Sequence, residues 1–468
     1  MAKRARPNAP DPTDAAVEAT EPRALASIGA SNEISTHDSR PSSSSLTGTS
    51  CPTNYAAGMG ILKSWAIGIL AIVTGLALFL TAMTISNNME SSVTQSDLEP
   101  FYTPPTPLSG KPGDLLRVEP LGIDVDGADA LRILYLTELD NGDLAAASGT
   151  AFIPTASSPQ VPRPAIAWTH GTVGQGDACA PSRSADPTSQ LTQFLPSMIQ
   201  LGWALVATDY TGLGTPGVQA YLLKDQEVRD TVNSVRALQQ IPNSGVGSRY
   251  AVFGHSQGGH TALWTGHLSK EFAPELDLLG VAAAAPAAEL TQIMSKQWDT
   301  LIGWVIGAEV MRSWPLRYPG LPVNEILTTP AQKNYDRLAE ECIKDAAIEA
   351  EVRMNAFNEN FFSSNPLDNA AWSSALADQT PPPLPAEMPL LLIQGTADEV
   401  VLPQPNAYLQ KTWCEAGTNI SALWLGGVGH TLAPAIGGPT AVDWLEKIFA
   451  GTVPKSTCGD PIPVLPPL

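Results

Sequence analysis

Residues 250–268 read YAVFGHSQGGHTALWTGHL, and this stretch indicates the fold more clearly than any other part of the chain. Its apolar start, Tyr250–Phe253, predicts a buried strand, and Gln257–Leu268 predicts a helix. Between them, Gly254–Gly258 fits the pattern Gly-x-Ser-x-Gly, which places a serine at a sharp strand-to-helix turn with strained backbone angles. The residues two positions away must be small, because larger side chains would clash with the turn. The stretch predicts that Ser256 is a nucleophile; the alternative is an ordinary glycine-rich loop.

Strands and helices alternate on both sides of this stretch. Further short apolar segments predict the other strands, of which the first two are antiparallel and the rest parallel: Leu131–Leu136, Ala147–Ile153, Ala165–Trp168, Trp203–Thr208, Leu278–Ala284, Pro389–Gln394 and Ser421–Leu425. The alternation is typical of the α/β class and predicts a mostly parallel, doubly wound sheet within residues 99–468.

A long insertion separates two of the predicted strands, 278–284 and 389–394. It covers about residues 285–385, has a helical pattern and ends in the proline-rich Pro381–Pro383. A helical insertion of this kind predicts a cap or lid over an active site.

A serine hydroxyl is a weak nucleophile at neutral pH and needs a base. The chain has only six histidines: His37, His170, His255, His260, His267 and His430. One precedes the sheet, one lies directly beside the serine, two follow on the helix after it, and one follows an earlier strand. Only His430 lies in a loop after the last predicted strand, which fits the chain order Ser, Asp or Glu, His of the α/β-hydrolase fold. The alternative is a structural histidine.

The base needs a carboxylate that fixes its tautomer and stabilises the imidazolium. Asp398 lies in a tight turn at the carboxyl end of strand 389–394, where such sheets place their catalytic groups. Glu399 is the second candidate, although its neighbouring position should turn it away. The alternative for Asp398 is a turn-capping aspartate.

A developing oxyanion needs backbone N–H groups that are already in place. One should belong to Gln257, immediately after the nucleophile. The second should come from the loop after strand 165–168, and the amide of Thr172 is the favoured donor. The competing turn, Asp209–Gly214, is expected to shape the sheet edge instead.

Charge is unevenly distributed along the chain. The formal net charge is −20, and because residues 1–64 carry six basic and six acidic residues, all of this excess lies after residue 64. An acidic body repels phosphate backbones, so nucleic acid is not an expected partner.

The N-terminal part has two segments. Residues 1–60 are rich in Ser, Thr, Pro and Ala and are predicted to be disordered. The segment 61–86 contains 21 uncharged residues, Trp65–Ile85, which is long enough to span a bilayer, and Lys63 before it places the N-terminus in the cytoplasm. The segment is predicted to be a transmembrane anchor or a signal peptide, the latter most naturally with translation from Met59, and a buried core helix is the alternative.

The chain has five cysteines, of which four follow the apolar segment: Cys179, Cys342, Cys414 and Cys458. No Cys-x-x-Cys pair occurs, so a zinc site is not expected. An even number in an exported domain suggests two disulfides with three possible pairings, and four buried free thiols are the alternative.

From about residue 99 to 468 the chain resembles the secretory lipases, the family of Candida antarctica lipase A within the α/β-hydrolase superfamily. Motifs that occur in order carry the resemblance: Pro100–Pro105, Cys179–Ser182, the serine turn, Asp398–Val401 and Cys458–Pro463. The turn His170–Thr172 resembles the bacterial branch of the family.

The resemblance implies a triad of Ser256, Asp398 and His430 and a helical cap. It also implies the disulfides Cys179–Cys342 and Cys414–Cys458, with Cys51 unpaired. Members of the family hydrolyse carboxylic esters, including triacylglycerols.

Together these features predict an exported or cell-surface serine hydrolase that cleaves carboxylic esters through an acyl-enzyme on Ser256. It is expected to need no metal or organic cofactor and to work at a membrane or lipid interface. An acyltransferase or a peptidase of the same fold is the alternative, since the fold does not choose between them. A catalytically silent binding protein is a third possibility, and the intact set of Ser, Asp and His argues against it.

Overall fold

The computed structural model describes residues 95–158 and 161–466, all of which belong to the compact unit Thr81–Leu468. The segments predicted at 1–60 and 61–86 lie outside the described residues. Within the part that is described, no helix is long and apolar enough to cross a membrane.

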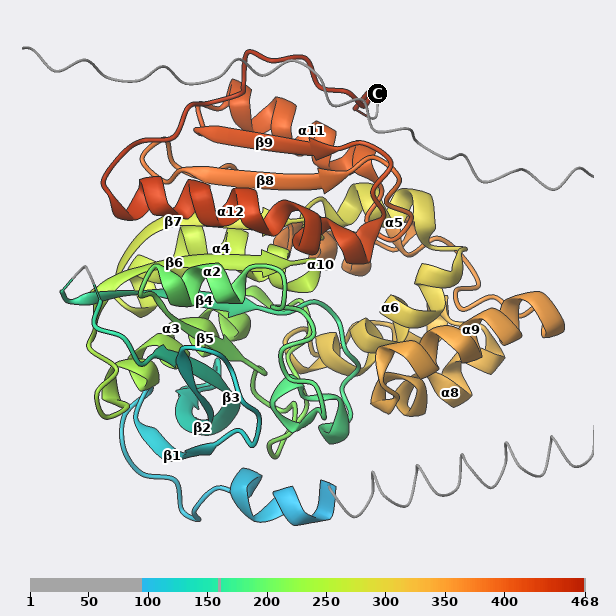
Figure 1. Ribbon diagram of the computed structural model, residues 1–468. Coiled ribbons are helices and arrows are strands. Elements are labelled where there is room, and N and C mark those ends of the chain that lie inside the picture. The colour runs from blue at the N-terminus through green and yellow to red at the C-terminus, as the bar shows by residue number, and fades with distance from the viewer. Residues whose placement is uncertain (1–94, 159–160, 467–468) are drawn as a thin grey trace, which may run out of the picture. The chain divides into compact units, whose positions relative to one another are not determined.

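A mixed sheet forms the centre of the described chain (Figure 1). Its order is β1-β2-β3-β5-β4-β6-β7-β8-β9. The strands are β1 (Leu115–Pro120), β2 (Ala128–Glu138), β3 (Leu144–Pro154), β4 (Arg163–Thr169), β5 (Ala204–Thr208), β6 (Val246–His255), β7 (Asp277–Ala284), β8 (Leu390–Gly395) and β9 (Ile420–Leu425). The pairs β1–β2, β2–β3 and β3–β5 are antiparallel and all others are parallel, which confirms the predicted α/β class.

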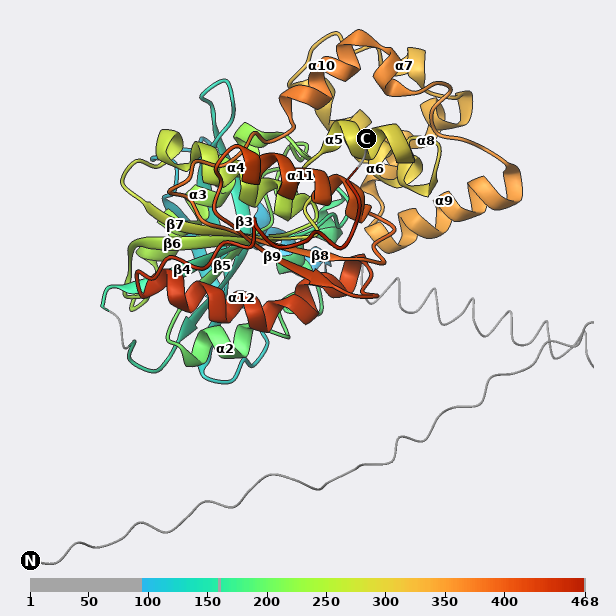
Figure 2. The ribbon, with the colours of Figure 1, turned by 90° about the horizontal axis from the view of Figure 1, so that it is seen from above.

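Helices cover both faces of this sheet (Figure 2). On one face lie α3 (Lys224–Gln240), α4 (Gln257–Phe272) and α11 (Pro403–Glu415), and on the other α2 (Leu195–Gln200) and α12 (Ala433–Phe449). Strand β6 is buried on both sides: Val252 joins the core beneath α3 and α4, whereas Phe253 joins the core beneath α2 and α12. Because side chains alternate along a strand, the apolar run at 250–253 fills two cores at once.

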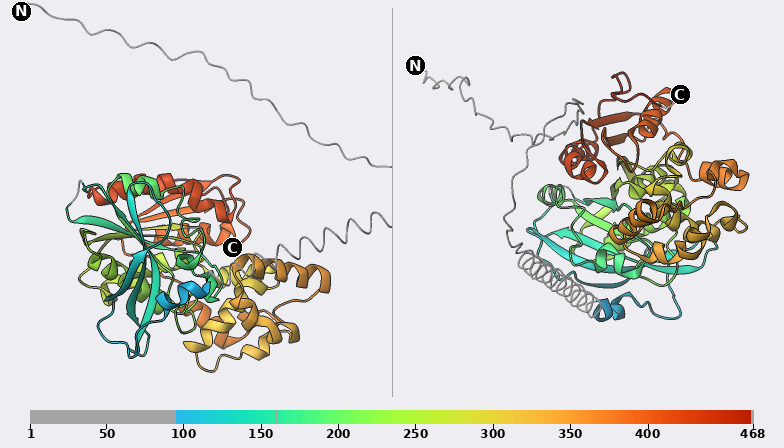
Figure 3. Two further views of the ribbon diagram at one scale, coloured as in Figure 1. Left: turned by 60° about the horizontal axis from the view of Figure 1, so that its bottom comes forward. Right: turned by 90° about the vertical axis from the view of Figure 1, so that its right-hand side faces the viewer.

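The insertion between β7 and β8 is helical, as the sequence predicts. It contains α5 (Leu290–Gln297), α6 (Leu301–Ser313), α7 (Val323–Ile326), α8 (Thr329–Glu340), α9 (Ile343–Phe357) and α10 (Ala370–Asp378). Two further views show that these helices project from one side of the sheet (Figure 3). They share their own apolar core, built around Trp304, Trp314 and Trp372, and residues 221–223 of the sheet domain pack into that core.

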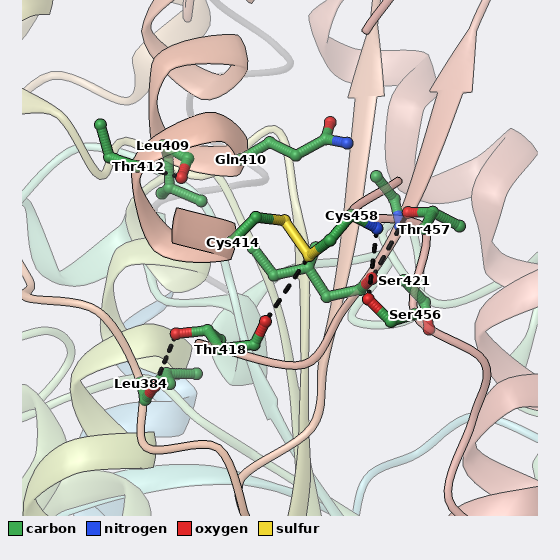
Figure 4. The surroundings of a disulfide bond; sticks show 12 residues. Leu384, Leu409, Gln410, Thr412, Cys414, Thr418, Ser421, Ser456, Thr457 and Cys458 are labelled. Carbon is green, nitrogen blue, oxygen red and sulfur yellow. Dashed lines mark hydrogen bonds between the residues drawn. A yellow bond between two sulfur atoms is a disulfide. The ribbon is translucent and has the colours of Figure 1, made fainter. Parts of the chain in front are cut away.

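Two disulfides stabilise this arrangement, with the pairing that the resemblance implies. Cys179–Cys342 joins the loop after β4 to the N-cap of α9 in the insertion. Cys414–Cys458 joins α11 to the C-terminal tail (Figure 4). The tail is also held against β9, because Thr457 Oγ1 accepts a hydrogen bond of 2.8 Å from the Ala422 amide and the Thr457 amide donates to the Ile420 carbonyl at 2.8 Å.

Candidate active site

Ser256 lies at the turn between β6 and α4, with backbone angles of φ 57° and ψ −116°. A positive φ is unfavourable for a residue with a side chain, and the surrounding hydrogen bonds must enforce it. The Ser256 amide donates to the carbonyl of Ala284 at the end of β7, at 3.0 Å. The Ser256 carbonyl accepts from the amides of His260 and Ala287, at 3.0 and 3.1 Å. The turn is therefore fixed from its own helix and from the neighbouring strand.

The glycines of the turn are required by close packing. A Cβ added to Gly254 would lie 2.0 Å from the Gly258 carbonyl oxygen and 2.2 Å from Thr169 Oγ1. A Cβ on Gly258 would lie 1.9 Å from the Thr169 carbonyl oxygen. These clashes with backbone cannot be relieved by rotating a side chain, so the spacing Gly-x-Ser-x-Gly follows from the contact with β4.

The structure brings three side chains together that are far apart in the chain. His430 Nε2 lies 2.9 Å from Ser256 Oγ, and His430 Nδ1 lies 2.8 Å from Asp398 Oδ2. Their burial is nearly complete, since Ser256 is 8% exposed and Asp398 is 2% exposed. The imidazole can therefore accept the serine proton through one nitrogen while the carboxylate holds the proton on the other.

The loop after β8 orients Asp398. Its Oδ1 accepts hydrogen bonds from the amides of Val400 and Val401, both at 2.9 Å. Oδ2 accepts from Gln394 Nε2 at 3.2 Å and faces His430. One oxygen is thus occupied by backbone donors and the other is presented to the imidazole, whereas Glu399 is exposed.

His255, to which the sequence assigns no contact with the other site residues, packs against His430. The ring centroids are 4.7 Å apart, and His255 Nε2 lies 3.2 Å from the His430 carbonyl oxygen. Burial and the neighbouring His430 hold the pKa of His255 well below its usual 6.5. The His255 ring is therefore neutral at pH 7 and donates its Nε2 proton to that carbonyl, which supports the backbone of His430. In the sequence, only the position of His255 directly beside Ser256 indicates that it belongs to the site.

The groups expected to face an oxyanion belong to two segments that adjoin Ser256. Gln257 is the first residue of α4, so its N–H has no acceptor within the helix. A Cβ on Gly171 would lie 3.3 Å from Ser256 Cβ, so the loop after β4 also lies next to the serine. In that loop the Thr172 hydroxyl is 2.7 Å from the hydroxyl of Tyr221.

The competing turn at 209–214 is structural. Asp209 is fully buried and accepts hydrogen bonds from Ser148 Oγ at 2.6 Å, from the Ser182 amide at 3.0 Å and from the Ser182 hydroxyl. Burial raises the pKa of this carboxyl. These bonds join the turn after β5 to β3 and to the segment at Ser182, and both strands lie in the interior of the sheet.

Comparison with known proteins identifies the family. Residues 186–457, more than half of the chain, match the model of a family described as secretory lipase. The chain belongs to the secretory lipase family. Lipase A of Moesziomyces aphidis is 23% identical over 393 residues, which cover 78% of this chain and 83% of that protein. A probable inactive lipase of Mycobacterium tuberculosis is 24% identical over 380 residues, which cover 75% of this chain and 82% of that protein.

The same fold occurs in a solved structure of Candida antarctica lipase A in its closed state. The TM-score is 0.60 at 21% identity, over 78% of this chain and 89% of that one. The secretory lipase described here therefore shares the α/β-hydrolase architecture of that enzyme.

An apolar cavity lies inside the insertion of this secretory lipase. Its lining is almost entirely hydrophobic and comes mainly from α5 and α6: Leu222, Leu290, Ile293, Met294, Gln297, Trp298, Ile302, Gly303, Ile306, Gly307, Val310, Met311, Trp314, Phe362, Pro366, Trp372 and Leu376. Leu222 belongs to the sheet domain and directly follows Tyr221, which contacts Thr172. The cavity thus reaches the segment before α3, which contacts the loop after β4 through Tyr221. Among residues 95–158 and 161–466, no group of His, Cys, Asp or Glu side chains is arranged to hold a metal ion.

Proposed function

We propose that this secretory lipase is a serine hydrolase that cleaves carboxylic esters through an acyl-enzyme on Ser256. One observation carries the proposal: the His430 imidazole lies within hydrogen-bond distance of Ser256 Oγ on one side and of Asp398 on the other. That arrangement activates a serine and serves little purpose otherwise.

In the first step Ser256 Oγ attacks the ester carbonyl carbon while His430 Nε2 takes the hydroxyl proton. His430 then gives this proton to the departing alcohol, and the acyl group stays on Ser256. In the second step water attacks the acyl carbon while His430 takes a proton from the water, and His430 then gives this proton to Ser256 Oγ as the carboxylic acid leaves. Asp398 keeps its charge throughout and stabilises the imidazolium.

The tetrahedral intermediates carry a negative oxygen, for which we assign two backbone donors. These are the amides of Gln257, at the N-terminus of α4, and of Thr172, in the loop after β4. The N-terminus of a helix also favours negative charge, which supports the first assignment.

The substrate class follows from the apolar cavity. A cavity with almost no polar lining accommodates an acyl chain rather than a peptide side chain with hydrogen-bonding groups. We therefore assign fatty-acid esters, triacylglycerols among them, as substrates, and the helical insertion at about 285–385 as the cap that covers the chain. The three site residues are all present in this chain.

Membership of the secretory lipase family supports export of the catalytic domain, residues 99–468, through the segment 61–86. The anchor and signal-peptide readings differ in one measurable quantity, the N-terminus of the native protein. An N-terminus after residue 86 supports a cleaved signal peptide. An N-terminus upstream of Met59 excludes translation from that methionine.

The test of the function is hydrolysis of p-nitrophenyl esters of increasing acyl length, beside peptide amides, by the wild type and by Ser256→Ala. We expect ester hydrolysis and a loss in kcat on the order of a thousandfold or more in the variant. Ser197→Ala, at an exposed serine of α2, is the matched control. A fluorophosphonate probe should label the wild type and the control but not Ser256→Ala. Near-normal ester hydrolysis by Ser256→Ala would refute the assignment.

A further inference from the structure

Glu227, in the first turn of α3, is a buried carboxylate that the mechanism above does not use. Its side chain is 1% exposed. Oε1 accepts hydrogen bonds from the Leu222 amide at 2.9 Å and from Gln257 Nε2 at 2.7 Å. Oε2 accepts from Thr261 Oγ1 at 2.7 Å. Taking a carboxylate out of water is costly, and well-packed apolar residues often replace buried ionic groups without loss of stability. Its presence therefore needs a reason.

Two of these hydrogen bonds connect Glu227 to the helix that follows the nucleophile. Gln257 is the residue whose amide we assign to the oxyanion, and its side chain is held by Glu227. Thr261, one turn further along α4, is held by the same carboxylate. Glu227 thus fixes the first turn of α4 from the side, at the point where the Gln257 N–H must point at the substrate.

The remaining hydrogen bond, from the Leu222 amide, connects Glu227 to the segment that contacts Thr172, the second assigned oxyanion donor. Glu227 accepts from the amide of Leu222, a residue with a positive φ of 53°, and so enforces a strained turn. Tyr221, directly before it, places its hydroxyl 2.7 Å from Thr172 Oγ1. The carboxylate that orients one oxyanion donor thus also fixes the loop against which the other donor rests.

A third neighbour of the carboxylate is His260. His260 Nδ1 lies 3.5 Å from Glu227 Oε2, while His260 Nε2 lies 2.7 Å from the carbonyl oxygen of Gln379. Gln379 caps α10, so this contact connects Glu227 to the end of the insertion.

We propose that Glu227 is the positioning residue of the oxyanion hole. Its oxygen Oε1 accepts hydrogen bonds from both the Gln257 side chain and the Leu222 amide, and in this way it connects the Gln257 side to the Thr172 side and sets the distance between the two backbone amides. This rests on the proposed ester hydrolysis. The two donors stabilise the tetrahedral intermediate more than they stabilise the ground-state ester carbonyl. Loss of the hydrogen-bonded connection through Glu227 therefore lowers kcat and leaves KM nearly unchanged.

Four variants test the inference. Glu227→Gln keeps a carbonyl oxygen that accepts from Leu222 and Gln257, whereas Glu227→Leu removes it. Gln257→Leu breaks the tie from the other end and retains the backbone amide. Asp230→Leu is the matched control: Asp230 is a fully buried carboxylate on the same helix, bonded to Thr211, Gln226 and Thr137 but not to the serine turn.

We expect Glu227→Leu and Gln257→Leu each to lower kcat about 10- to 100-fold, below the full loss of an oxyanion donor, with KM within about twofold. The double variant should be no slower than the slower single one, because both break one tie. Glu227→Gln should retain kcat within about threefold, and so should Asp230→Leu. The rate of fluorophosphonate labelling should follow kcat in all of them.

A kcat for Glu227→Leu equal to that of Asp230→Leu would overturn the inference, as would multiplicative losses in the double variant or a slow Glu227→Gln. Should Glu227→Leu not fold, Gln257→Leu decides alone, and a wild-type kcat there overturns the inference. Ester hydrolysis by the wild type and by Asp230→Leu keeps the proposed function intact in every one of these cases. Only an inactive wild type would remove it.

Discussion

Replacing Glu309 by glutamine should remove a large pH dependence of stability. Glu309 lies on α6 in the core of the insertion and is 1% exposed. Within the described chain neither of its carboxyl oxygens has a hydrogen-bond partner, whereas its backbone carbonyl accepts from Gln175 Nε2 at 2.9 Å. Burial raises the pKa of Glu309 from 4.5 to about 8, against the smaller opposing effects of Gln175 and Arg312. The side chain is therefore neutral at pH 7.

The sign and size of the effect follow from this pKa. Between pH 4.5 and about 8 the folded state keeps a proton that the unfolded chain has released, so a rise in pH through this window destabilises the folded state. A difference of one in pKa corresponds to about 1.4 kcal/mol, which gives about 5 kcal/mol over the window. At pH 5 the folded state has lost less than about 1 kcal/mol of this stability, and above about pH 8 it has lost all of it.

Glutamine has the same shape and never ionises. The stability of Glu309→Gln relative to the wild type should therefore grow by about 4 kcal/mol between pH 5 and pH 9. Urea unfolding followed by tryptophan fluorescence at pH 5, 7 and 9 measures this difference. Glu351→Gln, at an exposed position of α9, makes the same charge change and should show no such growth. Parallel pH profiles of wild type and Glu309→Gln would refute the reasoning.

Three further variants probe the site, the disulfide and the cavity. Asp398→Asn should lower kcat by on the order of 10³–10⁴, because an amide no longer selects the productive tautomer of His430; a loss below tenfold in steady-state ester hydrolysis would contradict this. Replacing Cys179 and Cys342 together by serine opens a loop of 163 residues and should cost about 5 kcal/mol in the chain-entropy model, seen as a lower Tm without reductant; an unchanged Tm would count against it. Ile306→Trp should fill part of the apolar cavity and lower kcat/KM for long-chain esters about tenfold relative to short-chain ones, and an unchanged ratio would show that acyl chains bind elsewhere.

Local pattern predicts much of the fold. The parallel strands other than the edge strand β9 are largely buried on both faces and therefore read as short apolar runs, and the turn glycines are fixed by backbone contacts that allow no other residue. Strand β1, with the sequence LLRVEP, is only partly buried, lies at the sheet edge and carries no apolar run, so it is absent from the prediction.

The predicted triad rests on chain order and on the few histidines present, and both constraints are available without a structure. By contrast, the contact of His255 with His430 and the three hydrogen bonds of Glu227 could not be predicted without a structure. The His255 contact forms only when the end of β6 meets the loop after β9, and the bonds of Glu227 form only when α3, α4 and the loop before α3 meet. A buried glutamate in an amphipathic helix has the same appearance in the sequence as an exposed one. Burial of a polar group is a tertiary property, which periodicity cannot reveal.

The insertion is anchored to the loops that carry the assigned groups. Near the oxyanion side, the amide of Ile343 donates to the Val173 carbonyl at 2.8 Å, beside the disulfide from Cys179. Near the acid, Gln297 Nε2 donates to the carbonyl of Glu399 at 3.1 Å, one residue after Asp398. The first anchor is covalent and the second is a single hydrogen bond. Because a disulfide does not open on the timescale of turnover, the junction of α8 and α9 stays attached to the loop after β4 during any movement of the insertion.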